Sequence, residues 1–159
     1  MNQLLNSPIE VGVRVVAVLE ALYPRSSDLD RIVLLDHIVL HGVDLGGEPR
    51  VHPDTPGRAA EMGIKRGLVR EAIQLMGARG LIARKFTPTG VRYTASEDAR
   101  PFLDLIGADY LARVRRRSAL AAEIFGDLPD AQIRDHIAQT LGKWSEEFGN
   151  PSNGGTPGD

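Results

Sequence analysis

His37 and His41 are the pair of side chains whose type and spacing could do chemistry in this chain. They are four residues apart, so a helix would present both imidazoles on one face, with Asp44 and His52 not far along the sequence. Two histidines at this spacing can bind zinc. The residue after His37 is not the glutamate of an H-E-x-x-H motif, and the chain has no cysteine. The apolar segment around the pair favours packing and hydrogen bonding over a metal site.

Other reactive residue types occur without the neighbours that catalysis would need. Acidic pairs fall at expected helix caps or on solvated faces, and Gly46-Gly47 lacks the lysine of a phosphate-binding loop. Ser118 and His136 have no local nucleophile context. We therefore expect no catalytic residue, no metal and no cofactor, and an enzyme is the least favoured class.

Basic side chains are concentrated in the middle of the chain. Residues 58–117 hold thirteen Lys or Arg against six acidic residues, whereas residues 1–57 hold four against eight and residues 118–159 two against seven. A local basic field attracts phosphate or an acidic protein surface. The candidates for phosphate contact are Lys65, Arg66, Arg70, Arg84, Lys85, Arg92, Arg115 and Arg116. A solvated basic face is the alternative, and it is favoured by the helix over 66–79, which has no Asn and only Gln74 for base reading. Arg and Lys alone fit contact with backbone phosphates better than sequence reading.

The elements that carry most of these cations resemble a helix-turn-helix with a wing. We expect a helix over 56–62, a turn at Gly63 and a second helix over 66–79. A basic hairpin follows over 81–94, with its turn at Pro88-Thr89-Gly90. Such a motif docks onto DNA or onto another protein.

The flanking segments predict further helices. A capping box of Ser7 and Glu10 starts a helix over 8–22. Ser27 and Asp30 start a second helix over 28–41, which ends at Gly42. Ser96 caps a short helix, and longer helices are expected over 108–125 and 130–148. The fold class is mainly α, with a small β-hairpin wing.

Length and composition set the domain organisation. We expect a winged-helix domain over 1–95, a C-terminal helical extension packed on it over 96–148, and a disordered tail over 149–159. The lack of cysteine, of a long apolar run and of a secretion signal predicts a cytoplasmic protein. The loop over 42–55 is too long and too rich in Gly and Pro to be a mere connector.

Several short motifs resemble one known family. They are Asn6-Ser7-Pro8-Ile9-Glu10, His41-Gly42-x-Asp44-Leu45-Gly46-Gly47, His52-Pro53, Arg79-Gly80-Leu81-Ile82 and Gly90-x-Arg92-Tyr93. Over about residues 6–128 the chain resembles the middle components of bacterial ABC-three-component systems. Its Gly-Gly loop with the following His-Pro is the most specific part of the resemblance. His37 departs from the aromatic residue expected at that position.

The resemblance implies a non-catalytic winged-helix adaptor between an Smc-like ABC ATPase and a nuclease or other effector, as in Lamassu-type defence against phages and plasmids. It implies partner contacts at Arg14, Asp44, Gly46, Gly47 and His52 by matching position. Non-specific double-stranded DNA is a further candidate partner. The alternative is a free-standing winged-helix transcription regulator, which an isolated gene with a nearby operator would favour.

Overall fold

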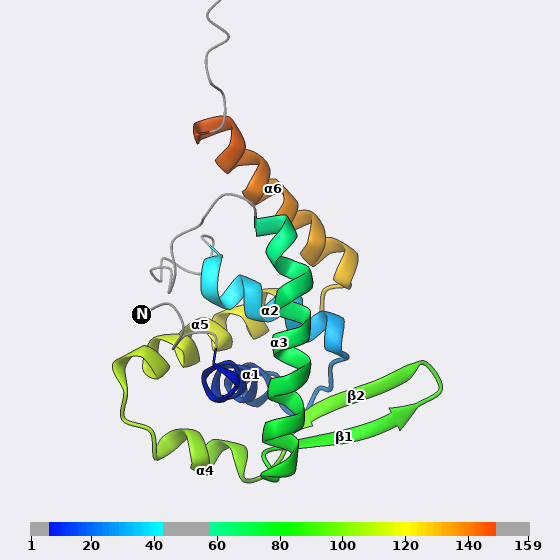
Figure 1. The fold of residues 1–159 in the computed structure, drawn as a ribbon, viewed down its shortest axis with the longest axis vertical. Coiled ribbons are helices and arrows are strands. Elements are labelled where there is room, and N and C mark those ends of the chain that lie inside the picture. Colours follow the sequence, from blue (N-terminus) through cyan, green and yellow to red (C-terminus); the bar gives the residue numbers. More distant parts are fainter. Residues whose placement is uncertain (1–6, 43–57, 149–159) are drawn as a thin grey trace, which may run out of the picture.

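The computed structural model describes residues 7–42 and 58–148, with side chains for all of these except 58–62 and 140–148. This part of the chain forms six helices and one two-stranded hairpin (Figure 1). In chain order the elements are α1 (Pro8–Leu22), α2 (Leu29–His41), α3 (Arg58–Ala78), β1 (Ile82–Thr87), β2 (Gly90–Ala95), α4 (Ala99–Asp104), α5 (Asp109–Phe125) and α6 (Asp130–Phe148). The mainly helical prediction with a small hairpin is confirmed.

Helix α1 is the centre of the hydrophobic core. It packs against α2, α3, α4 and α5, and Val15, Val16 and Leu19 have no exposed surface (Figure 1). The start is the predicted one, because the Ser7 side chain accepts a hydrogen bond from the Glu10 backbone N–H at 3.2 Å. A helix with neighbours on several sides can bury a valine-rich sequence on all of its faces. This segment is therefore helical, although valine has a lower helix propensity than alanine or leucine.

Helix α2 starts at a different cap from the predicted one. Asp28, not Ser27, is the N-cap, and its carboxylate accepts from the Arg31 backbone N–H at 2.8 Å. Ser27 is instead buried in an antiparallel bridge, exchanging two backbone hydrogen bonds of 2.9 and 2.8 Å with Tyr93 of β2. The prediction was wrong by one residue because this long-range strand pairing holds Ser27. The predicted end at Gly42 is confirmed.

Helix α3 corrects the predicted turn at Gly63. One continuous helix runs from Arg58 to Ala78, so the two short helices expected over 56–62 and 66–79 do not exist as a helix-turn-helix. Gly63 does not have a positive φ, and a Cβ built there would meet nothing within 4 Å. A glycine inside a helix costs only about 1 kcal/mol relative to alanine. The apolar side chains farther along α3, including Val69 and Met76, are buried and hold the helix in place.

The hairpin follows the predicted pattern. Strands β1 and β2 pair antiparallel from Ile82 opposite Ala95 to Thr87 opposite Gly90, and the turn lies at Pro88-Thr89. Gly80 has a φ of 76° where the chain leaves α3, and Gly90 has a φ of 132° at the start of β2. Both are conformations that favour glycine. The hairpin extends away from the helices (Figure 1).

Two arginines connect α2 and α5 reciprocally. Arg31 of α2 donates to the Phe125 and Gly126 carbonyls at the end of α5, at 3.0 and 2.7 Å. Arg117 of α5 is buried and donates to the Val39, Ile38 and Gly42 carbonyls at the end of α2. Cations at helix C-termini satisfy carbonyls that have no partner within their own helix. Each helix therefore supplies an arginine that binds the C-terminal carbonyls of the other.

The C-terminal helices agree with the expected ranges, apart from one cap. Asp98, not Ser96, precedes α4, and the Ser96 hydroxyl donates to the Gly80 carbonyl at 2.6 Å instead. Ile133 and Ile137 of α6 are buried, and this helix packs on α2. The predicted tail over 149–159 lies outside the described residues. None of the described helices is long and apolar enough to cross a membrane.

The continuity of α3 predicts the effect of alanine at Gly63. Gly63→Ala should raise the free energy of unfolding by about 0.5–1 kcal/mol, because alanine loses less backbone entropy in a helix and has space there. Gly80→Ala is the matched control and should lower it, because φ is positive at that position. Urea denaturation followed by circular dichroism measures both. Loss of stability in Gly63→Ala would indicate a turn at this residue.

Candidate interaction surface and internal ion cluster

Four of the predicted phosphate-contact residues are exposed cations. Arg70 of α3 and Arg84 and Lys85 of β1 lie on the surface, and none of them forms an ion pair with a described acidic residue. The Arg84 guanidinium lies over the Phe86 ring, 5.2 Å from its centroid. Arg116 of α5 is exposed as well. Arg70, Arg84 and Lys85 can therefore reach an external anion without first breaking an ion pair to a described acidic residue. Arg116 has an interaction within the chain.

The other four candidates are engaged inside the molecule. Arg66 pairs with Asp30 at 2.9 Å, and Arg115 pairs with Asp104 at 2.8 Å. Arg92 donates to the hydroxyl and the carbonyl of Ser26, both at 2.8 Å. Lys65 contacts the buried carboxylate of Asp36 at 2.9 Å. A charged side chain held in this way contributes less to an external field than the sequence count suggests.

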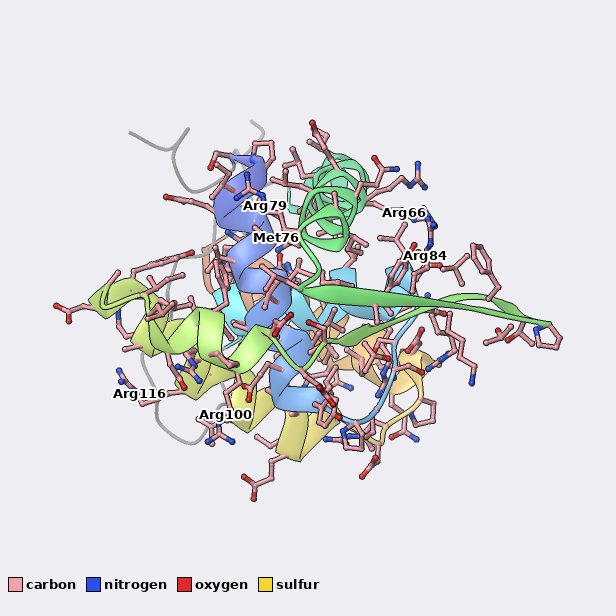
Figure 2. The ribbon with its side chains drawn as sticks, turned by 90° about the horizontal axis from the view of Figure 1, so that it is seen from below. Arg66, Met76, Arg79, Arg84, Arg100 and Arg116 are labelled. Atoms are coloured by element: carbon pink, nitrogen blue, oxygen red, sulfur yellow. The ribbon has the colours of Figure 1, made fainter. Side chains whose placement is uncertain are left out.

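The basic side chains do not lie on one face. Figure 2 shows Arg66 and Arg84 on the side of α3 and the hairpin, whereas Arg100 and Arg116 lie on the opposite side, on α4 and α5. The cations that follow one another in the sequence are therefore divided between two surfaces. The surface that includes the hairpin is the candidate site for an anionic partner.

The largest cluster of buried charge lies inside the protein, where α1, α2 and α3 meet. The Arg14 guanidinium donates to both oxygens of Asp36, at 2.9 Å from Nε and 3.3 Å from Nη2. Lys65 Nζ lies 2.9 Å from Asp36 Oδ2. The Asp36 side chain is fully buried, and that of Arg14 is 3% exposed. One carboxylate thus connects three helices through two cations.

The electrostatics of this cluster favour the charged forms of Asp36 and Arg14. Burial alone would raise the pKa of Asp36, but the charges of Arg14 and Lys65 outweigh it and hold this pKa well below its usual range. Burial would lower the pKa of Arg14, and Asp36 more than compensates and raises it. Burial also raises the pKa of Tyr110, which α5 places beside Arg14. The cluster has a structural role, in which one carboxylate contacts two cations from neighbouring helices.

The predicted partner-contact residues fall in two places. Arg14 is 2% exposed and contacts Asp36, so the structure places it in the interior and not on a docking surface. Asp44, Gly46, Gly47 and His52 lie outside the described residues.

The histidine pair lies side by side on α2. The rings of His37 and His41 have centroids 5.1 Å apart and are tilted by 47°. Asp36, the adjacent carboxylate, is occupied by Arg14 and Lys65. Within the described ranges, no three His, Cys, Asp or Glu side chains converge as metal ligands would. The two rings contact each other on α2.

The buried roles of Asp36 and Arg117 were not predicted from the sequence. A signal for Arg117 exists in the sequence, since it lies three residues after Val114 and four before Ala121, both of which are buried on α5. An arginine in register with an apolar stripe indicates a buried cation. The carbonyls it contacts are nonlocal, so the sequence does not identify them.

The ion cluster predicts how acid affects stability. Asp36 has a lower pKa folded than unfolded, so its contribution is complete above about pH 4 and is lost as pH falls toward the folded pKa. Asp36→Asn should cost about 3–5 kcal/mol, because it leaves two cations without their carboxylate. Its unfolding free energy should also depend less on pH in the acid range than that of the unmodified chain.

Chemical denaturation at pH 3 to 7 measures both effects. Glu97→Gln is the control, because this carboxylate is exposed, and it should keep the pH dependence of the unmodified chain. An equal acid dependence in Asp36→Asn would show that this carboxylate is not the group that acid protonates.

Comparison with known proteins gives one match. No curated protein and no solved structure matches the chain. A family model does match residues 4–147, and it is described as ABC-three component (ABC-3C) system Middle Component 2. The match covers α1 to α5, the hairpin and nearly all of α6. The chain therefore belongs to the Middle Component 2 family of ABC-three component systems, whose name describes one component of a multi-component assembly.

Proposed function

We propose that this chain is a non-catalytic adaptor subunit that links an Smc-like ABC ATPase to a nuclease-type effector in a bacterial defence complex of the Lamassu type. Family membership over residues 4–147 carries the proposal, because a middle component acts together with other components. The proposed targets of the complex are phage and plasmid DNA, and the proposed location is the cytoplasm.

The use of buried charge supports a binding role over a catalytic one. Arg14, Asp36 and Arg117 are the buried charged side chains of the described chain, and all of them form contacts between helices. Catalytic sites usually leave a perturbed charged group open toward a substrate. Here the buried charges stabilise the packing of the helices, and the surface is available to bind a partner.

We assign the fold to the winged-helix class, with α2 and α3 as the helix pair and β1–β2 as the wing. The chain order supports this assignment, because three helices precede the hairpin. The Ser27–Tyr93 bridge supports it further, since it adds a short third strand position between α1 and α2 to the hairpin. The helix pair thus differs from the one expected over 56–79, and its connection is the long segment 43–57.

The start of α3 is the proposed contact surface for the ATPase. Ile64 is 70% exposed, and it lies within the first two turns of the helix that follows the segment with Asp44 and His52. A single exposed apolar residue is ordinary on a protein surface. In the sequence, Ile64 follows a long glycine-rich segment that matches the family by position. It gives the partner an apolar anchor, and such anchors contribute most of the binding energy of an interface.

This placement predicts the result of co-purification from cells that express the neighbouring genes. Ile64→Ser should reduce recovery of the ATPase with the tagged chain about tenfold, which corresponds to about 1.4 kcal/mol. Asp44→Ala/His52→Ala should reduce it as well. Leu105→Ser is the matched control, because Leu105 is 87% exposed and follows α4, at the other end of the molecule in Figure 1.

Two outcomes would contradict the proposal at different levels. Unchanged assembly in the Ile64 and loop variants would exclude this contact surface. Failure of the unmodified chain to co-purify with any product of the neighbouring genes would contradict the adaptor role itself. Thermal unfolding of each variant shows whether the domain remains folded.

The alternative function is a free-standing transcription regulator, and the basic hairpin beside α3 favours it as the second candidate. A regulator prefers its own site over random duplex by about a thousandfold or more. Selection of bound duplexes from random and genomic pools distinguishes the two functions. An adaptor should enrich no sequence, whereas a tight and selective enrichment by the lone chain would support a regulator.

A further inference from the structure

We propose that the outer half of the hairpin, residues 84–92, is a binding site for duplex nucleic acid that inserts into the major groove without sequence preference. The site is distinct from the proposed ATPase contact on α3. It does not depend on the adaptor role, and binding of the lone chain to duplex tests it separately.

The charge of the hairpin region is the first support. Residues 72–96 contain no Asp or Glu, and they include Arg79, Arg84, Lys85 and Arg92. Lys85 pairs directly opposite Arg92 in the register. Like charges at opposed positions of an antiparallel pair are unfavourable. A partner with dense negative charge removes that cost, so the hairpin is complementary to a polyanion.

The two faces of the hairpin both carry a cation. Because neighbouring residues of a strand point to opposite faces, Arg84 lies on one face with Phe86, and Lys85 lies on the other. Both cations are exposed, as is Phe86, at 72%. A groove of duplex nucleic acid has a row of phosphates on each wall, so cations on both faces of an inserted ribbon would each meet one row. An acidic peptide that lies on one face would not reach the exposed cation on the other face.

The dimensions agree with this placement. A strand rises about 3.4 Å per residue, so Lys85 lies about 7 Å along β1 from Thr87, where the turn begins. The major groove of B-form DNA is about 12 Å wide and about 8.5 Å deep, and it admits a two-stranded ribbon. With the turn at the groove floor, Arg84 and Lys85 therefore lie near the phosphates at its rim.

The polar groups near the turn are used within the hairpin. The Thr87 hydroxyl donates to the Gly90 carbonyl at 2.6 Å, and it lies 3.3 Å from the Thr89 hydroxyl. The side chain beside them is the apolar Phe86. Sequence reading in the major groove requires donors and acceptors aimed at base edges. A ribbon with these groups already engaged contacts the duplex through phosphates, so it binds any sequence.

Binding measured over a series of salt concentrations tests whether Arg84 and Lys85 both contact phosphates. Fluorescence anisotropy of the full chain with a random-sequence duplex gives the slope of log affinity against log salt concentration. Each phosphate contact contributes about 0.9 to this slope. Arg84→Ala and Lys85→Ala should each flatten it by about 0.9, and the double variant by about 1.8. The control Arg100→Ala/Arg113→Ala removes the same charge from exposed positions on α4 and α5 and should leave the slope unchanged.

A second duplex tests the groove. Glucosylated 5-hydroxymethylcytosine fills the major groove and leaves the phosphates intact, so this duplex should bind at least about tenfold more weakly than its unmodified form. Equal binding of the two duplexes would overturn insertion into the major groove. An effect of Arg84→Ala without one of Lys85→Ala would overturn the two-faced contact. Equal flattening by the Arg100/Arg113 control, or stronger binding to polyglutamate than to duplex, would overturn the nucleic-acid site.

Discussion

A carboxylate held between two cations in the protein interior connects the first three helices. Asp36 of α2 contacts Arg14 of α1 and Lys65 of α3, and its position under the surface excludes the water that would otherwise solvate it. Burying a charge is costly unless every partner is in place. The cluster therefore stabilises one arrangement of α1, α2 and α3 and penalises every arrangement that separates them. Together with the buried Val69 and Met76, this contact holds α3 against α1 and α2.

The reciprocal arginines extend the same principle to the C-terminal half. Arg31 and Arg117 hold the C-terminal ends of α5 and α2, so α2 is joined to α5 near both of its own ends as well as through apolar side chains. Neither contact could be exchanged for simple apolar packing, because the carbonyls at each helix end would then lack partners. The helices after the hairpin belong to the same hydrophobic cluster as those before it. The described helices therefore share one hydrophobic core, and the exposed basic side chains lie on the surface of that one domain.

Local signals in the sequence predicted most elements, and nonlocal contacts explain the differences. The Ser7 cap, the hairpin turn and the ranges of α5 and α6 depend on neighbouring residues, and the structure agrees with them within a residue. The turn at Gly63 failed because a glycine alone does not end a helix whose later turns are buried. The cap at Ser27 failed because Tyr93, far along the chain, pairs with it. For the candidate site, the exposure of Arg84 and Lys85 was predictable from their charge, because Lys and Arg are almost never fully buried without a partner. The engagement of Arg66 and Arg92 was not, since their partners are thirty-six and sixty-six residues away.

The hairpin is attached to the segment between α1 and α2 and extends from there beyond the helices. The middle of β2 is fixed to the segment between α1 and α2 twice, by the backbone pair of Ser27 with Tyr93 and by the contact of Arg92 with Ser26. The hairpin and the first turn of α2 therefore share one attachment segment, because Ser27, which pairs with Tyr93, is followed directly by Asp28, the residue that caps α2.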